Sequence, residues 1–129
     1  MIDNKLTKLL STLSRKEFTR FREFAHSPYF NKHKEVKALL NYFDRIYPKF
    51  DEKNCHRKKI FKKIFPGENH DQSKLAVVFT YTQRLMEEFL VSERVREDKY
   101  LKNRLLLKDL RQRKQFKLYE SRLGKTQKG

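Results

Sequence analysis

Large apolar side chains recur at intervals of three and four residues along most of this chain, which is the spacing of one face of an α-helix. The first such stripe is Leu6, Leu9, Leu10 and Leu13, and similar stripes follow as far as residue 123. The chain has three glycines and three prolines in 129 residues, whereas an all-β chain needs many turn residues. We therefore predict an all-α fold, an irregular array of five to seven helices with short connections.

Capping residues and prolines mark the ends of the expected helices. Ser14 and Glu17 form a capping box, and Leu13 and Phe18 stand at the two positions of a hydrophobic staple. Pro28 ends this second helix near residue 26, because proline disfavours helical geometry in the residue before it. The other predicted caps are Asp3 or Asn4 for the first helix, Asn31 for the third, and Asp71 or Ser73 for the fifth.

The pattern also predicts where the domain ends and which side chains fill its core. The fourth helix should run roughly from Cys55 to Phe65, and the last should begin near Phe116 and be closed by Gly124. We expect a single helical domain over residues 1–123 and a basic flexible tail over residues 124–129. The stretch Ser27-Pro28-Tyr29-Phe30-Asn31 should stop one helix, supply two aromatics to the core and cap the next helix. Ten side chains are predicted to be largely buried: Phe18, Phe21, Phe24, Leu39, Leu40, Phe43, Phe61, Phe65, Phe79 and Phe89.

Basic residues outnumber acidic residues by 32 to 16, which gives a formal net charge of +16. Such an excess indicates which partners the protein can attract: nucleic-acid phosphates, acidic protein surfaces or an anionic membrane surface. The excess is uneven, since residues 101–129 carry ten basic and two acidic side chains, whereas residues 51–100 carry eleven and nine. This asymmetry favours a localised anion-binding surface over a uniformly lysine-rich, solvated exterior.

Two groups of cations follow helical spacing. Four lysines in the segment 55–65 occupy one arc of the helix, opposite an arc of apolar side chains. Their mutual repulsion, a few tenths of a kcal/mol for each neighbouring pair, would be relieved by a bound anion. Three further cations in the segment 99–117 share a face. The predicted nucleic-acid-binding residues are Lys58, Lys59, Lys62, Lys63, Arg104, Lys108 and Arg111.

No group of residues has the spacing of an active site, a metal site or a cofactor site. Cys55 and His56 are adjacent, and adjacent residues of a helix point about 100° apart, so we expect both on the surface rather than paired. Cys55, His56 and His70 lack the paired short spacings of a zinc site, and three glycines cannot build a phosphate-binding loop. The other histidines, His26 and His33, have no nucleophile or carboxylate at a telling spacing. We expect a protein that is not an enzyme and has no cofactor.

The single cysteine and the lack of long apolar segments predict a cytoplasmic location. Cys55 is the only cysteine, so an intramolecular disulfide is impossible and a reducing compartment is the simpler assumption. The first 13 residues lack the apolar segment of a secretion signal, and no apolar run approaches the ~20 residues that span a bilayer.

The leucines of the segment 101–110 surround most of a helix: Leu101, Leu105, Leu106, Leu107 and Leu110. A partner should therefore cover them, either a second copy, through self-association at Leu101–Leu110, or the remainder of a larger protein. The alternative is that the last helix folds back over them.

Two resemblances bear on the fold. The stretch from Lys58 through Leu90 resembles the two-helix part of a winged-helix DNA-binding domain, in which the helix after Ser73, with Arg84, would be the recognition helix. It departs from that domain because no β-hairpin wing follows. The stretches Leu13-Ser14, Glu17-Phe18, Phe21, Phe24, Ser27-Pro28-Tyr29-Phe30-Asn31 and Phe65-Pro66-Gly67 resemble the N-terminal part of a family of mostly longer, uncharacterised all-helical bacterial proteins, over roughly residues 6–90.

The family resemblance implies a helical array and a chain shortened relative to that family, and it implies no activity. Charge and patterning together predict a basic helical binding module that contacts nucleic-acid backbone, DNA or RNA, without strong sequence specificity. The alternative is an interaction or scaffold module for an acidic or helical protein.

Overall fold

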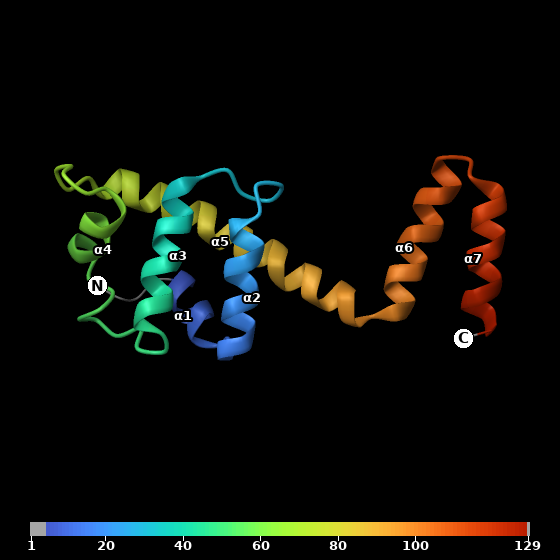
Figure 1. Cartoon of the computed structure of the whole chain (residues 1–129), viewed down its shortest axis with the longest axis horizontal. Helices are drawn as coiled ribbons and strands as arrows, with labels where there is room; N and C mark the ends of the chain where they lie inside the picture. Colours follow the sequence, from blue (N-terminus) through green and yellow to red (C-terminus); the bar gives the residue numbers. More distant parts are fainter. Residues whose placement is uncertain (1–4, 129) are drawn as a thin grey trace. The chain divides into compact units, whose positions relative to one another are not determined.

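The computed structural model describes residues 5–128, with side chains described through residue 124. This part of the chain forms seven α-helices and no strand, which confirms the predicted all-α array (Figure 1). In order, the helices are α1 (Lys5–Ser11), α2 (Arg15–His26), α3 (Lys34–Ile46), α4 (Arg57–Ile64), α5 (Gln72–Glu97), α6 (Lys99–Gln112) and α7 (Phe116–Lys128). The chain divides into two compact units, Met1–Phe89 and Leu90–Gly129, and α5 begins in the first and ends in the second. That both units belong to a single domain over residues 1–123 stays a prediction.

The start of α2 is fixed by the capping box that the sequence predicts. The Ser14 hydroxyl accepts a hydrogen bond from the Glu17 backbone N–H at 3.1 Å, and the Glu17 carboxylate accepts one from the Ser14 N–H at 2.8 Å. Leu13 and Phe18 are both buried, as a hydrophobic staple requires. The Tyr47 hydroxyl at the end of α3 donates to the Leu13 carbonyl at 2.9 Å and so ties this corner to the next helix.

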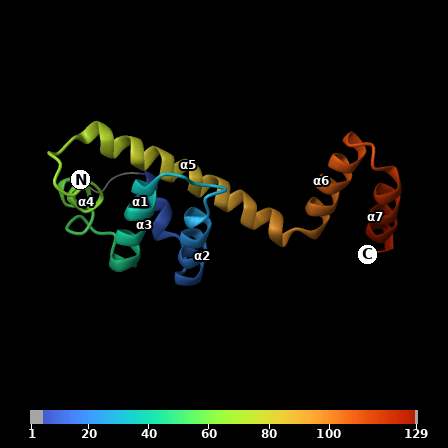
Figure 2. The ribbon, with the colours of Figure 1, turned by 45° about the horizontal axis from the view of Figure 1, so that its top comes forward.

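Aromatic rings dominate the core of the first unit. In this unit α2 packs against α3 and α3 against α4, and the two views show α5 alongside them (Figure 2). The ring of Phe89 on α5 lies 5.3 Å from that of Phe21 and 5.6 Å from that of Phe24, both on α2. Eight of the ten predicted core side chains are buried. The other two, Phe24 and Phe65, the residue that caps α4, are partly exposed.

The loop between α2 and α3 differs most from expectation. Tyr29 and Phe30 are 87% and 46% exposed, so the prediction that they fill the core was wrong. Asn31 points inward instead and is only 5% exposed. Its amide donates to the Ala25 carbonyl at 3.0 Å and the His33 carbonyl at 3.2 Å, and its oxygen accepts from the His33 N–H at 2.9 Å. Because these bonds hold the amide inside, Asn31 does not cap α3, and His33 takes that position.

Two other helix ends test the predicted caps. Asp71 is confirmed at the start of α5, since its carboxylate accepts hydrogen bonds from the backbone N–H groups of Ser73 at 2.9 Å and Lys74 at 3.3 Å. The predicted helix stop at Gly124 was wrong, because α7 continues to Lys128. The predicted caps Asp3 and Asn4, and the tail residue Gly129, lie outside the described residues.

In the second unit, α6 and α7 form a helical hairpin (Figure 1). Lys114 has a φ of 59°, the left-handed conformation that usually favours glycine. Around it the Lys114 N–H donates to Arg111 O at 3.0 Å, and the Gln115 N–H donates to Leu110 O at 2.9 Å, which is the Schellman pattern of a helix end. The last helix thus folds back on α6, but the alternative prediction that it covers the leucines was wrong for Leu105 and Leu106, which are exposed, whereas Leu110 is buried.

We predict that Phe21→Ala lowers the free energy of unfolding by roughly 3–5 kcal/mol, because the ring is completely buried against Phe89. Urea denaturation followed by the helical circular-dichroism signal measures this. The control is Phe116→Ala, which removes an exposed ring of α7 and should change stability by less than about 0.5 kcal/mol. Equal effects of the two substitutions would show that the aromatic core does not hold the first unit together.

Candidate nucleic-acid interface

The lysines of α4 stand on a short helix whose other face is buried. Ile60, Phe61 and Ile64 point into the core, against α3. The helix begins after His56, whose ring nitrogen accepts a hydrogen bond from the Lys58 N–H at 3.3 Å, and it ends at Phe65, before Pro66 and a Gly67 with φ of 81°. The chain therefore holds this helix at both ends and along its apolar face.

On the outer face of α4 all four predicted lysines are exposed: Lys58, Lys59, Lys62 and Lys63. None of them forms an ion pair with a described residue. The structure thus brings these four cations together on one rigid surface, with their charges available to a ligand.

The second predicted cluster lies on α6, in the other unit. Arg104, Lys108 and Arg111 are exposed and spaced at single helical turns. The nearby Asp109 carboxylate pairs with Arg113 at 2.6 Å rather than with any of the three. Each cluster is intact within its own unit.

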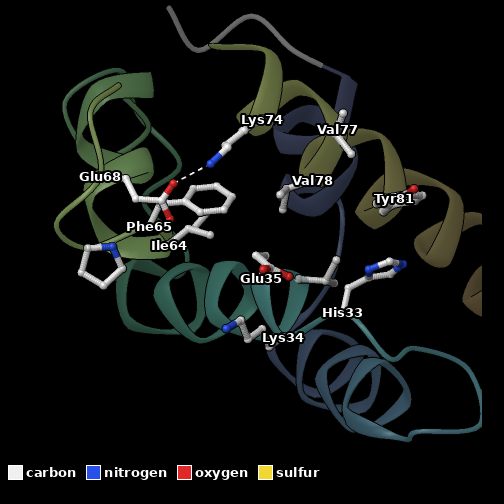
Figure 3. Close-up of a pocket in the computed structure, with 12 residues that line it drawn as sticks. His33, Lys34, Glu35, Ile64, Phe65, Glu68, Lys74, Val77, Val78 and Tyr81 are labelled. Carbon is white, nitrogen blue, oxygen red and sulfur yellow. Dashed lines mark hydrogen bonds and ion pairs between the residues drawn. The ribbon is translucent and has the colours of Figure 1, made fainter. Parts of the chain in front are cut away.

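Sequence reasoning missed a groove in the first unit (Figure 3). It has a volume of about 620 Å³ and lies between the start of α3, the end of α4 and the first half of α5. Its apolar lining comes from Val36, Ile64, Phe65, Pro66, Val77 and Val78, and its polar lining from His33, Lys34, Glu35, Glu68, Lys74 and Tyr81. These residues come from three separate stretches of sequence, so no local pattern predicts their meeting.

Two interactions order the rim of this groove. The Lys74 ammonium lies 2.6 Å from the Glu68 carboxylate and 5.6 Å from the centre of the Phe65 ring (Figure 3). The hydrogen bond to Glu68 and the charge of that carboxylate raise the pKa of Lys74. Opposite, the His33 and Tyr81 rings stack nearly parallel, with 4.4 Å between centroids and 12° between planes. The rim thus combines one neutralised ion pair with one flat aromatic pair.

The segment that resembles a winged-helix domain forms α4 and α5 with a turn between them. Arg84 is exposed on α5, as a recognition helix would require. The residues after α5 that the structure describes form two more helices and no strand, so the wing is missing there. The resemblance therefore extends to two helices and a turn.

The prediction that Cys55 lies on the surface was wrong, because its side chain is buried next to Tyr42 and the Asn54 turn. Burial raises the pKa of the Cys55 thiol to about 11, and the Asp51 carboxylate adds to the rise. Such a thiol is a poor nucleophile at neutral pH.

Among the described residues, no group of three or more His, Cys, Asp or Glu side chains is arranged to hold a metal ion. None of the described helices combines the length and the apolar character needed to cross a bilayer. No protein family, curated protein or solved structure matches the chain.

We predict that Cys55 reacts with the thiol reagent DTNB roughly a hundred-fold more slowly in the folded protein than after unfolding. A pKa of about 11 instead of 9.0 lowers the thiolate fraction by about two powers of ten at mildly alkaline pH. The rise in absorbance of the released thiolate, with and without denaturant, measures both rates. Equal rates would show that the thiol is accessible and ionises normally.

Proposed function

We propose that the chain is a non-enzymatic basic module that binds the backbone of nucleic acid without strong sequence specificity. The proposal includes the cytoplasmic location that the single cysteine favours. The observation that carries it is the exposed lysine surface of α4, which forms no ion pair with a described residue: Lys58, Lys59, Lys62 and Lys63.

The positive charge of α4 favours an anionic ligand. Four cations within two helical turns repel one another, and no described carboxylate relieves that repulsion. Phosphates spaced along a nucleic-acid strand would relieve it and would release condensed counterions on binding. The buried Ile60, Phe61 and Ile64 keep the helix in place, so little ordering is needed when the ligand arrives.

The cluster on α6 adds a second contact of the same kind. Arg104, Lys108 and Arg111 are exposed, and the basic excess of residues 101–129 surrounds them with positive charge. Arginine pairs with phosphate through two parallel hydrogen bonds, which lysine cannot do. We propose that both clusters contact phosphates, each through its own unit.

We predict that binding to mixed-sequence duplex DNA weakens steeply with salt. About five neutralised phosphates should give a slope of about −4.5 in a plot of log affinity against log salt concentration. Lys58/Lys59/Lys62/Lys63→Gln should flatten that slope by roughly 0.9 for each lysine that contacts a phosphate. Fluorescence anisotropy of labelled DNA and RNA measures both slopes, and circular dichroism checks the fold.

The matched control removes the same charge from elsewhere in the first unit, as Lys16/Lys37/Lys49/Lys53→Gln. This control variant should lower the affinity less and leave the salt slope nearer that of the wild type. Charges that do not contact a phosphate act on the ligand only at a distance, where salt screens them. If the wild type binds neither nucleic acid at ~50 mM salt, the charge is a solvated exterior and the proposal fails.

One observation favours a second function, docking of an acidic helical protein. Among the described side chains of α6 and α7, Leu110 is the only one buried, whereas Leu105, Leu106, Phe116 and Leu118 are exposed. Exposed apolar side chains gathered on one hairpin are typical of an interaction surface. The basic excess there favours an acidic amphipathic helix and disfavours a second copy, which would carry the same charge.

We predict that a designed amphipathic helix with leucines on one face and glutamates on the other binds the full chain. Leu105→Ala/Leu106→Ala should weaken that binding about ten-fold, because partial burial of two leucines is lost. The control is Val91→Ala, an exposed apolar position on α5. Calorimetry measures the affinity, and light scattering measures the mass. A mass that rises with concentration from 15.8 kDa, without peptide binding, would instead identify a second copy as the partner.

A further inference from the structure

The loop between α2 and α3 holds an aromatic side chain out into solvent. Tyr29 is 87% exposed, and its ring meets that of Phe30 edge-on, with 5.0 Å between centroids. Phe30 in turn stacks on Phe24, with 4.1 Å between centroids and 18° between planes. Beneath this stack the ring of Phe24 packs on Phe89 of the core. The exposed aromatic pair is therefore built on the core rather than attached to a loose loop.

The backbone of this loop is fixed independently of its aromatic side chains. The N–H groups of Phe30 and Asn31 both donate to the Ser27 carbonyl, at 3.1 Å and 3.0 Å. The buried Asn31 amide adds its three hydrogen bonds to Ala25 and His33. None of these hydrogen bonds involves the Tyr29 ring, so the turn does not require an aromatic residue at this exposed position.

A second aromatic surface begins four residues later, at the edge of the groove. His33 and Tyr81 form the stacked pair described above, and both side chains are exposed (Figure 3). Four residues of chain span at most about 14 Å, so Tyr29 and His33 are within reach of one short ligand. The two residues that flank His33, Lys32 and Lys34, are exposed and form no ion pair with a described residue.

We propose that Tyr29, Phe30 and the His33–Tyr81 pair, here called the aromatic surface, bind unpaired nucleobases, so that the preferred ligand is single-stranded nucleic acid. This inference rests on the proposed backbone binding, and it names the form of nucleic acid. Aromatic rings interleaved with cations are what such strands require, because bases stack on the rings while the cations follow the phosphates.

Base pairing decides between the two forms of nucleic acid. In a duplex the faces of the bases are covered by their neighbours, and an exposed ring gains nothing from them. An unstructured peptide could also contact exposed rings, but it would leave Lys32 and Lys34 without a specific role. Single strands use both the flat faces and the cations, and every base offers a face, so little sequence specificity is expected.

The test compares three ligands of equal length by fluorescence anisotropy at low salt: a mixed-sequence single strand, its duplex, and an abasic strand with the same phosphates. We expect the single strand to bind more tightly than the other two. Tyr29→Ala should weaken binding of the single strand roughly five- to a hundred-fold, which corresponds to ~1–3 kcal/mol at 1.4 kcal/mol per tenfold. Tyr29→Ala should not change binding of the abasic strand.

Further variants separate stacking from other causes. Tyr29→Phe should restore binding of the single strand, because it keeps the ring and removes the hydroxyl. Tyr100→Ala removes a ring that is 70% exposed on α6, outside the aromatic surface, and should weaken binding of the single strand much less than Tyr29→Ala. Equal losses in Tyr29→Ala and Tyr100→Ala would overturn the assignment of the aromatic surface.

The outcomes also distinguish this inference from the proposed function. If the abasic strand binds as tightly as the base-bearing strand, backbone binding stands and base stacking is overturned. The same holds if the duplex binds as tightly as the single strand and Tyr29→Ala changes neither. If the chain binds none of the three ligands, both the proposed function and this inference fail.

Discussion

The side-chain amide of Asn31 decides how the chain passes from α2 to α3. A buried amide must find hydrogen-bond partners, and this one finds them in the Ala25 carbonyl, in the last turn of α2, and in the backbone of His33. With Asn31 turned inward, its two neighbours in sequence, Phe30 and Lys32, are turned outward. The same hydrogen bonds set where α3 begins. Because α4 packs against α3 and the groove lies beside both, the position of α3 also affects α4 and the groove. One amide thus fixes the turn, the exposed rings and one wall of the groove.

Features that follow helical spacing, such as eight of the ten core side chains, could be predicted from the sequence, whereas features that depend on contacts made only in the folded chain could not. The capping box at Ser14 and Glu17 involves residues three apart, so a short pattern contains all of its information. Asparagine often caps helices, but the direction of the Asn31 side chain depends on its hydrogen bond to the Ala25 carbonyl. Only the folded turn brings that carbonyl within reach. Cys55 looked like a surface residue beside lysines, and only the packing of the segment before α4 shows it to be buried.

Part of the candidate site could be predicted because it follows a short pattern in the sequence. The α4 lysines were identified because cations and apolar residues separate cleanly at helical spacing, and the structure leaves all four exposed. The His33–Tyr81 pair joins residues 48 positions apart, which no local pattern brings together. The two cationic helices also differ in kind. On α4 the lysines stand apart from the buried apolar face, whereas on α6 the exposed Leu105 lies directly beside Arg104.

The buried state of Cys55 has a practical consequence for labelling. Because the chain has one cysteine and its thiol is enclosed with a raised pKa, a maleimide dye added to the native protein will find few reactive thiolates. A cysteine introduced at an exposed position such as Val91 would then be modified selectively, with no need to remove the natural one. Replacing Cys55 would instead open a space in the packing beside Tyr42. The native chain is thus already suited to carrying a single spectroscopic probe at a position of choice.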